Sequence, residues 1–278
     1  MTTYGMVIDV SRCTGCYNCF LACRDEHVGN DYPPLTAAQP PSGHKWMDVQ
    51  EYERGKFPRV RVDYLPLPCQ QCKEATCISK TPGGSVYRRA DGIVVIDPAK
   101  AAGQREIVSS CPHRVIYWNE AKNIPQKCTF CAHLLDQGWK QPRCVEACPT
   151  QALVFGDLDD PNSEVSKLCK KAPVEDLHPE YGLKPSVRYI ALPKRFLAGE
   201  VVYANKTETT AKGVQLSLRG GKQIINATTD NYGDFSIEAL EPGVDYVLQI
   251  TAPGYKSREV RVGTRNDTDL GIILLDPA

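Results

Sequence analysis

Residues 13–23 read Cys13-Thr-Gly-Cys16-Tyr-Asn-Cys19-Phe-Leu-Ala-Cys23, which puts four cysteines within eleven residues. Thiolates separated by two residues let a tight loop wrap three corners of an Fe4S4 cube. Gly15 supplies the permissive backbone dihedrals that such a loop needs. We expect the fourth cysteine to begin a helix and to point away from that cube. The segment therefore predicts an iron–sulfur site that takes its fourth ligand from elsewhere in the chain.

The remaining cysteines extend this pattern, because twelve of the thirteen lie before residue 150. They form three further groups: Cys69-x2-Cys72-x4-Cys77, then Cys111-Pro112, and then Cys128-x2-Cys131-x12-Cys144-x3-Cys148-Pro149. The first group has the spacing of bacterial ferredoxins, with Arg24 in place of the usual proline after the fourth cysteine. In two-cluster ferredoxins the fourth cysteine ligates the other cluster.

Structural zinc is the alternative for these cysteines. The last group, from Cys128 to Cys148, would make a fair four-thiolate zinc site. Zinc explains the first group badly, because four cysteines in eleven residues do not form two separated ligand pairs. Two histidines, His113 and His133, lie near cysteines of these groups. We expect them to be neighbours of ligands or surface groups, and not ligands.

Composition excludes other classes of function. The chain has 278 residues, with 33 basic and 33 acidic side chains. This balance disfavours nucleic-acid binding, which needs a basic excess to replace counterions on phosphate. The N-terminus lacks the pattern of a secretory signal, and the apolar runs are far shorter than the ~20 residues that span a bilayer. We therefore expect a cytoplasmic protein without direct membrane insertion, whose cysteines bind metal instead of forming disulfides.

Residues 1–155 resemble the electron-transfer subunits of the molybdopterin (dimethyl sulfoxide reductase) superfamily. Those subunits resemble two fused ferredoxins, one inserted in the other, and typically hold four Fe4S4 clusters. Four cysteines of that pattern are missing here, at Thr81, Ala101, Gln104 and Ile107. Under the reciprocal pairing of ferredoxins all four losses fall on one cluster, so the resemblance implies that three complete sites remain.

The same pairing implies a ligand set for each site. Site 1 is Cys13, Cys16 and Cys19 with Cys148; site 2 is Cys128, Cys131 and Cys144 with Cys23; site 3 is Cys69, Cys72 and Cys77 with Cys111. Cys169 is left over, and we interpret it as an unpaired thiol. We identify no catalytic residue in the chain.

Basic residues adjoin the expected ligands repeatedly. A four-thiolate cube is negatively charged, so nearby cations would stabilise it, although solvated surface charge remains an equally good interpretation of each one. The residues concerned are Arg12, Arg24, Lys73, Lys127 and Arg143.

The domain organisation follows from where the cysteines stop. We expect an α+β double ferredoxin-like domain over residues 1–158, with an irregular, proline-containing arm over about 24–66. A connecting segment over 159–194 would lead to an all-β domain over 195–278. About seven alternating strands predict a sandwich or small barrel there. The turns at Thr229–Phe235 and Glu241–Gly243 resemble those of transthyretin-like or carboxypeptidase-regulatory domains.

These features favour an electron-transfer or accessory subunit. The superfamily resemblance implies a large partner subunit that carries the molybdopterin cofactor, with three Fe4S4 clusters in this chain that transfer electrons or set the redox state of the metal. A respiratory subunit that serves a reductase or a formate dehydrogenase is a second hypothesis. In a third hypothesis the clusters are structural, and the β domain is a binding module.

Overall fold

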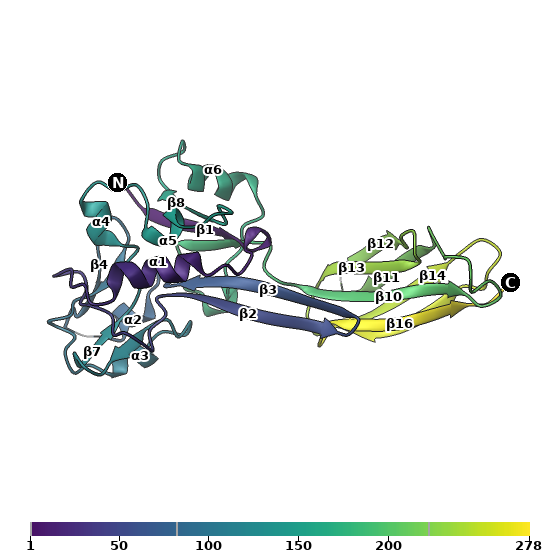
Figure 1. The fold of residues 1–278 in the computed structure, drawn as a ribbon, viewed down its shortest axis with the longest axis horizontal. Helices are drawn as coiled ribbons and strands as arrows, with labels where there is room; N and C mark the ends of the chain where they lie inside the picture. The colour runs from purple at the N-terminus through teal and green to yellow at the C-terminus, as the bar shows by residue number, and fades with distance from the viewer. Residues whose placement is uncertain (1, 82, 222) are drawn as a thin grey trace. The chain divides into compact units, whose positions relative to one another are not determined.

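The computed structural model describes residues 2–81, 83–221 and 223–278. The chain forms two compact units (Figure 1). The first comprises Met1–Glu51 and Asp63–Leu192, and the second comprises Tyr52–Val62 and Pro193–Ala278. The predicted order of an α+β unit and then an all-β unit is confirmed.

The first unit is organised around a three-stranded sheet. Strand β1 (Tyr4–Asp9) pairs antiparallel with β8 (Leu153–Asp157) and parallel with β9 (Val187–Ile190). The apolar centre of β1, residues 6–8, is fully buried, which explains why an uninterrupted apolar run forms the middle strand. This unit also contains two short hairpins that are separate from the sheet: β4 (Val86–Arg88) pairs with β5 (Val94–Ile96), and β6 (Tyr117–Asn119) pairs with β7 (Ile124–Gln126).

Helices in this unit are short, and most contain or adjoin cysteines. Their bounds are α1 (Asn18–His27), α2 (Thr76–Ser79), α3 (Glu106–Ser109), α4 (Ala132–Asp136), α5 (Arg143–Glu146) and α6 (Glu164–Lys171), with 3-10 turns η1 (Val10–Arg12) and η2 (Pro179–Tyr181). The expected start of the first helix at Cys23 is wrong, because α1 begins five residues earlier and already includes Cys19.

Two segments are more regular than expected. In the second half of the arm expected at 24–66, and two residues beyond it, β2 (Met47–Lys56) and β3 (Arg59–Pro68) form a two-stranded hairpin. The alternation of Arg and Val from Arg59 to Val62 is a strand pattern that the nearby prolines obscured. The segment 159–194 does not merely connect the domains, because it supplies α6 and also β9, which completes the sheet around β1.

The second unit is a sandwich of two sheets and not a closed barrel. One sheet has the order β13-β10-β16 and the other β12-β11-β14-β15. The strands are β10 (Arg195–Tyr203), β11 (Gln215–Gly220), β12 (Gln223–Thr228), β13 (Asp234–Leu240), β14 (Asp245–Thr251), β15 (Arg258–Gly263) and β16 (Thr268–Leu275). Side chains from both sheets, such as Leu197 and Leu218, form one fully buried core, which explains the alternation in the sequence.

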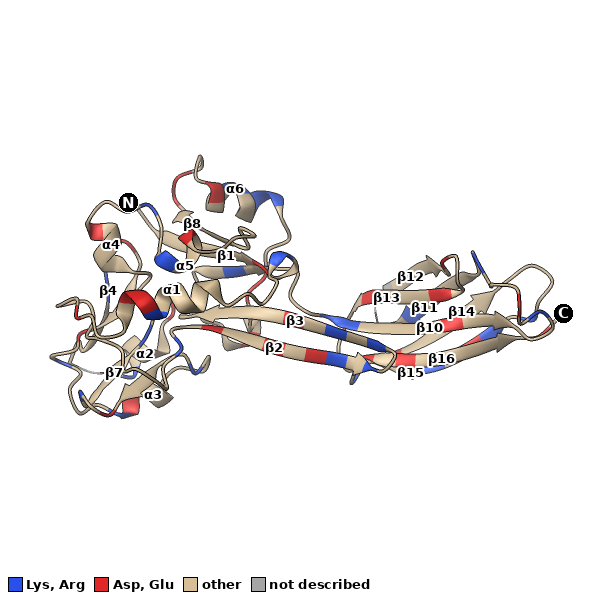
Figure 2. Cartoon of the chain, in the orientation of Figure 1, with Lys and Arg blue, Asp and Glu red and all other residues tan. Residues whose placement is uncertain are grey.

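Part of the β2–β3 hairpin belongs to this second unit. Charged residues of both signs follow one another along β2 and β3 (Figure 2). The Arg61 guanidinium lies 4.3 Å from the centroid of the Phe196 ring and pairs with Glu238 at 2.7 Å. Arg54 Nη1 lies 3.1 Å from Asp267 Oδ2. Cation–π and ionic contacts therefore join residues 52–62 to the sandwich.

We expect Asp267→Ala to lower the free energy of unfolding of the second unit by about 3 kcal/mol, because it leaves buried donors without an acceptor. The Asp267 side chain is only 2% exposed, accepts a hydrogen bond from Phe196 N at 2.9 Å, and also contacts Arg54 and Arg195. Glu238→Ala is the matched control, because its side chain is 58% exposed. Hydrogen exchange of amides in the sandwich measures both variants; equal effects would contradict this expectation.

Candidate metal centres

The first cysteine loop depends on a glycine in the left-handed region. Gly15 has φ +66°, and a Cβ placed on it would lie 2.5 Å from Cδ1 of the Tyr64 ring. The loop then enters α1, which contains Cys19 and Cys23 one turn apart. One turn of helix advances the chain by ~6 Å over four residues, so these two thiols can serve adjacent sites.

The four thiols predicted for site 1 lie near enough for their charges to affect one another. Burial raises the pKa of the Cys19 thiol to about 12, and nearby thiolates add to this rise. The thiolates concerned are those of Cys13, Cys148 and Cys16. Burial acts to raise the pKa of Cys148 as well, but hydrogen bonds from the Thr150 hydroxyl and from backbone N–H groups outweigh it and lower that pKa. Backbone N–H of Ala152 donates to Cys148 Sγ at 3.3 Å, so the chain is prepared to hold a thiolate there.

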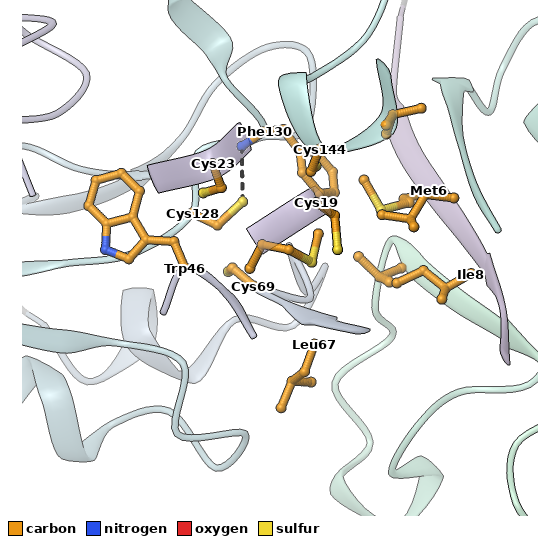
Figure 3. Packing of buried hydrophobic residues seen from close by; sticks show 14 of the residues in the cluster. Met6, Ile8, Cys19, Cys23, Trp46, Leu67, Cys69, Cys128, Phe130 and Cys144 are labelled. Atoms are coloured by element: carbon orange, nitrogen blue, oxygen red, sulfur yellow. Dashed lines mark hydrogen bonds between the residues drawn. The ribbon is translucent and has the colours of Figure 1, made fainter. Parts of the chain in front are cut away.

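Site 2 is the most deeply buried of the three. Burial raises the pKa of Cys144 well above its usual value. The charges of Cys131, Cys128 and Cys23 raise it further. Figure 3 shows Cys23 and Cys128 in the packed interior, with backbone N–H of Phe130 donating to Cys128 Sγ at 3.4 Å. Phe130 and Cys131 have φ of 52° and 50°, so the loop reaches this geometry without a glycine.

Site 3 surrounds a cavity. Its four cysteines line one pocket, together with the buried side chain of Lys127. Burial raises the pKa of Cys72 to about 12. The thiolates that add to this rise are those of Cys69, Cys111 and Cys77. Four soft sulfur donors around one pocket suit an iron–sulfur cluster.

Thiols of site 2 are near thiols of both other sites. The charge of Cys19, in site 1, helps to raise the pKa of Cys23 and of Cys144, both in site 2. The charge of Cys69, in site 3, helps to raise the pKa of Cys128, in site 2. Site 2 therefore adjoins both of the other sites, a relation that spacing alone could not provide.

Apolar packing surrounds two of the four positions that lack the cysteine of the superfamily pattern. Ala101 and Ile107 are fully buried in a small core with Val86 and Ile96. Gln104 donates from Nε2 to Ser85 Oγ at 2.9 Å and to the Lys100 carbonyl at 2.7 Å. Three of the four positions that lack cysteine thus contribute packing or hydrogen bonds, and the fourth, Thr81, is also buried.

A buried polar network beside site 2 was not predicted. Nε2 of His27 lies 3.7 Å from Cys131 Sγ, and burial lowers the pKa of His27 to about 3. Nε2 of His133 lies 2.9 Å from Glu26 Oε1, which also accepts a hydrogen bond from the Tyr32 hydroxyl at 2.7 Å. The sequence does hold a clue to the position of His27. It follows Cys23 by four residues, a spacing that puts both side chains on the same face of α1.

The basic residues near the ligands differ in their surroundings. Lys127 is 2% exposed, whereas Lys73 and Arg12 are exposed. Arg24 donates to the carbonyls of His44 and Pro41, and Arg143 contacts Glu26 and Glu146. Of the five basic residues beside the expected ligands, only Lys127 is both deeply buried and part of the lining of a site.

All thirteen cysteines are free thiols. Within the described ranges, no three or more His, Cys, Asp or Glu side chains gather closely enough to hold a single metal ion. Cys169 is half-buried on α6, and burial raises its pKa. His113 is also half-buried and lies beside the rings of His178 and Tyr181.

Comparison with known proteins agrees with this architecture. Residues 60–158 match the 4Fe-4S dicluster domain, and residues 197–274 match the carboxypeptidase regulatory-like domain. The chain is 40% identical to the pyrogallol hydroxytransferase small subunit of Pelobacter acidigallici, over 99% of this chain and 100% of that protein.

Other relatives match a shorter part of the chain. A putative iron-sulfur subunit of dimethyl sulfoxide reductase from Halobacterium salinarum is 35% identical over 68% of this chain and 79% of its own length. A sulfite dehydrogenase subunit of Allochromatium vinosum is 34% identical over 70% and 85%. In the described residues, no helix is long and apolar enough to cross a bilayer.

Proposed function

The chain belongs to the iron–sulfur electron-transfer subunits of molybdenum enzymes, and from this premise we propose that it holds three Fe4S4 clusters beside the catalytic subunit of a pyrogallol–phloroglucinol transhydroxylase. The partner would carry the molybdopterin cofactor and move a hydroxyl group between polyhydroxylated aromatic rings. Such a reaction has no net oxidation, so this chain would set the redox state of the metal centre in a cytoplasmic two-subunit complex.

The observation that carries the proposal is the extent of the match. The likeness to the Pelobacter subunit covers 99% of this chain and so includes the β sandwich, whereas the Halobacterium subunit matches over 68%. A reductase or dehydrogenase subunit remains the alternative supported by these shorter matches. The three groups of four thiols support the proposed number of clusters.

The residues of this chain would hold and shield the clusters. Each bound cluster would accept or donate one electron. Burial of the site 2 thiols would shield a cluster held there from water. Site 1 lies nearest the surface, because Cys16 is exposed and the neighbouring side chains of Tyr17 and Leu21 are 37% and 58% exposed. We propose that this apolar surface faces the catalytic subunit.

Anaerobically purified protein is expected to contain about twelve irons and as many sulfides per chain, because three sites each bind one cube. Iron and acid-labile sulfide assays on the same sample measure this. Zinc analysis of the same sample is the control. About eight irons, or stoichiometric zinc, would contradict the assignment of three clusters.

Purification with the natural partner tests the catalytic role. A two-subunit complex that converts pyrogallol to phloroglucinol supports the transhydroxylase. A complex that exchanges electrons with quinones in a membrane would support the respiratory alternative instead. Redox titration followed by electron paramagnetic resonance (EPR) tests the structural hypothesis, since clusters that never change oxidation state would favour it.

A further inference from the structure

Lys127 is a buried cation at the wall of site 3. It is 2% exposed and is one of the largest fully buried side chains in the chain. Its Nζ donates to the carbonyl of Val94 and, at 3.1 Å, to the carbonyl of Cys128. An ammonium group buried this deeply requires compensation, because removing a charge from water is costly.

The carbonyls of Val94 and Cys128 accept hydrogen bonds from Lys127 Nζ, but as neutral groups they do not neutralise its positive charge. Throughout the described ranges, no carboxylate lies within ion-pair distance of Lys127 Nζ. The groups that face the same pocket as Lys127 instead include cysteine side chains, among them Cys77 and Cys111. The Lys127 side chain also lines the cavity that the four thiols of site 3 surround.

We propose that Lys127 is a positioning residue that raises the reduction potential of site 3 by holding a buried positive charge against it. Reduction adds one electron and therefore one negative charge at the site. A fixed cation stabilises the more negative, reduced state more than the oxidised state. Burial makes this effect larger than that of an exposed lysine, because solvent and salt do not screen it.

This inference rests on the proposed cluster at site 3. The test uses the full chain in its complex, purified anaerobically and titrated with redox mediators while EPR follows each cluster. Cys111→Ala identifies the signal of site 3. In Lys127→Met the equilibrium constant for reduction of that cluster is expected to fall at least tenfold, which is a shift of 59 mV for one electron.

Two further variants make the test specific. Lys73→Met removes the same charge from an exposed position next to Cys72, so we expect less than a threefold change. Lys127→Arg keeps the charge and should leave the potential near that of the unmodified protein. An unchanged potential in Lys127→Met, or an equal shift in Lys73→Met, would overturn the proposal.

Loss of the site 3 cluster from a Lys127 variant would also test the proposal. If Lys127→Met fails to load site 3, full loading of Lys127→Arg with a near-normal potential supports charge compensation. Failure of both variants would mean that the lysine is needed for packing, which contradicts the proposal. Fewer than three clusters in the unmodified protein would instead contradict the proposed function, so the two failures are distinguishable.

Discussion

Cys23→Ala and Cys144→Ala are expected to lose the same EPR signal, although these cysteines come from the first and last groups of the sequence. Both are assigned to site 2, and the charges of Cys131, Cys128 and Cys23 raise the pKa of the buried Cys144 thiol, so the four thiols lie near one another. Each variant should contain about eight irons in place of about twelve. EPR of the reduced proteins, together with iron analysis, measures both effects.

Variants of site 1 and of the spare cysteine are the controls. Cys19→Ala and Cys148→Ala should share the loss of a different signal, since these two thiols interact with each other in site 1. Cys169→Ala should keep all signals, because this thiol lies on α6 outside the three sites. A shared loss for Cys23→Ala and Cys19→Ala would show that the first group ligates one cluster by itself, which contradicts reciprocal pairing.

The sequence predicts how the thiols group, but it does not predict their surroundings. Spacing reports which cysteines can share a loop, and reciprocal pairing then assigns Cys23 and Cys148 to opposite sites. The adjacency of the sites depends on how α1 and the loop at Cys69 pack, which spacing does not encode. Burial distinguishes Lys127 from Lys73, yet both appear in the sequence as a lysine beside a ligand.

The fold was predictable where periodicity was strong. Alternating apolar residues indicated the strands of the sandwich, and a barrel was excluded only by how these strands divide into two sheets. The hairpin at 47–68 was missed because its prolines and charges resemble those of an irregular arm. Strand β9 was missed because its register is set by pairing with β1, a contact between distant parts of the chain.

Gly15→Ala is expected to destabilise the site 1 loop by about 3 kcal/mol, from left-handed backbone strain and from overpacking. The backbone there has φ +66°, and the new Cβ would lie 2.5 Å from the Tyr64 ring, so either the ring or the loop must shift. Displacement of the loop moves Cys13 and Cys16 relative to Cys148. We expect the site 1 signal to be lost and the iron content to fall from about twelve toward about eight.

Gly29→Ala is the matched control for this substitution. Gly29 has a similar φ of +74°, but a Cβ added there would meet nothing within 4 Å. It should therefore cost only the backbone strain, about 1 kcal/mol, and retain every cluster. Tyr64→Ala in the Gly15→Ala background removes the steric contact and should recover part of the site 1 signal. If both glycine variants lost iron equally, backbone strain alone would explain the defect and the contact with Tyr64 would be irrelevant.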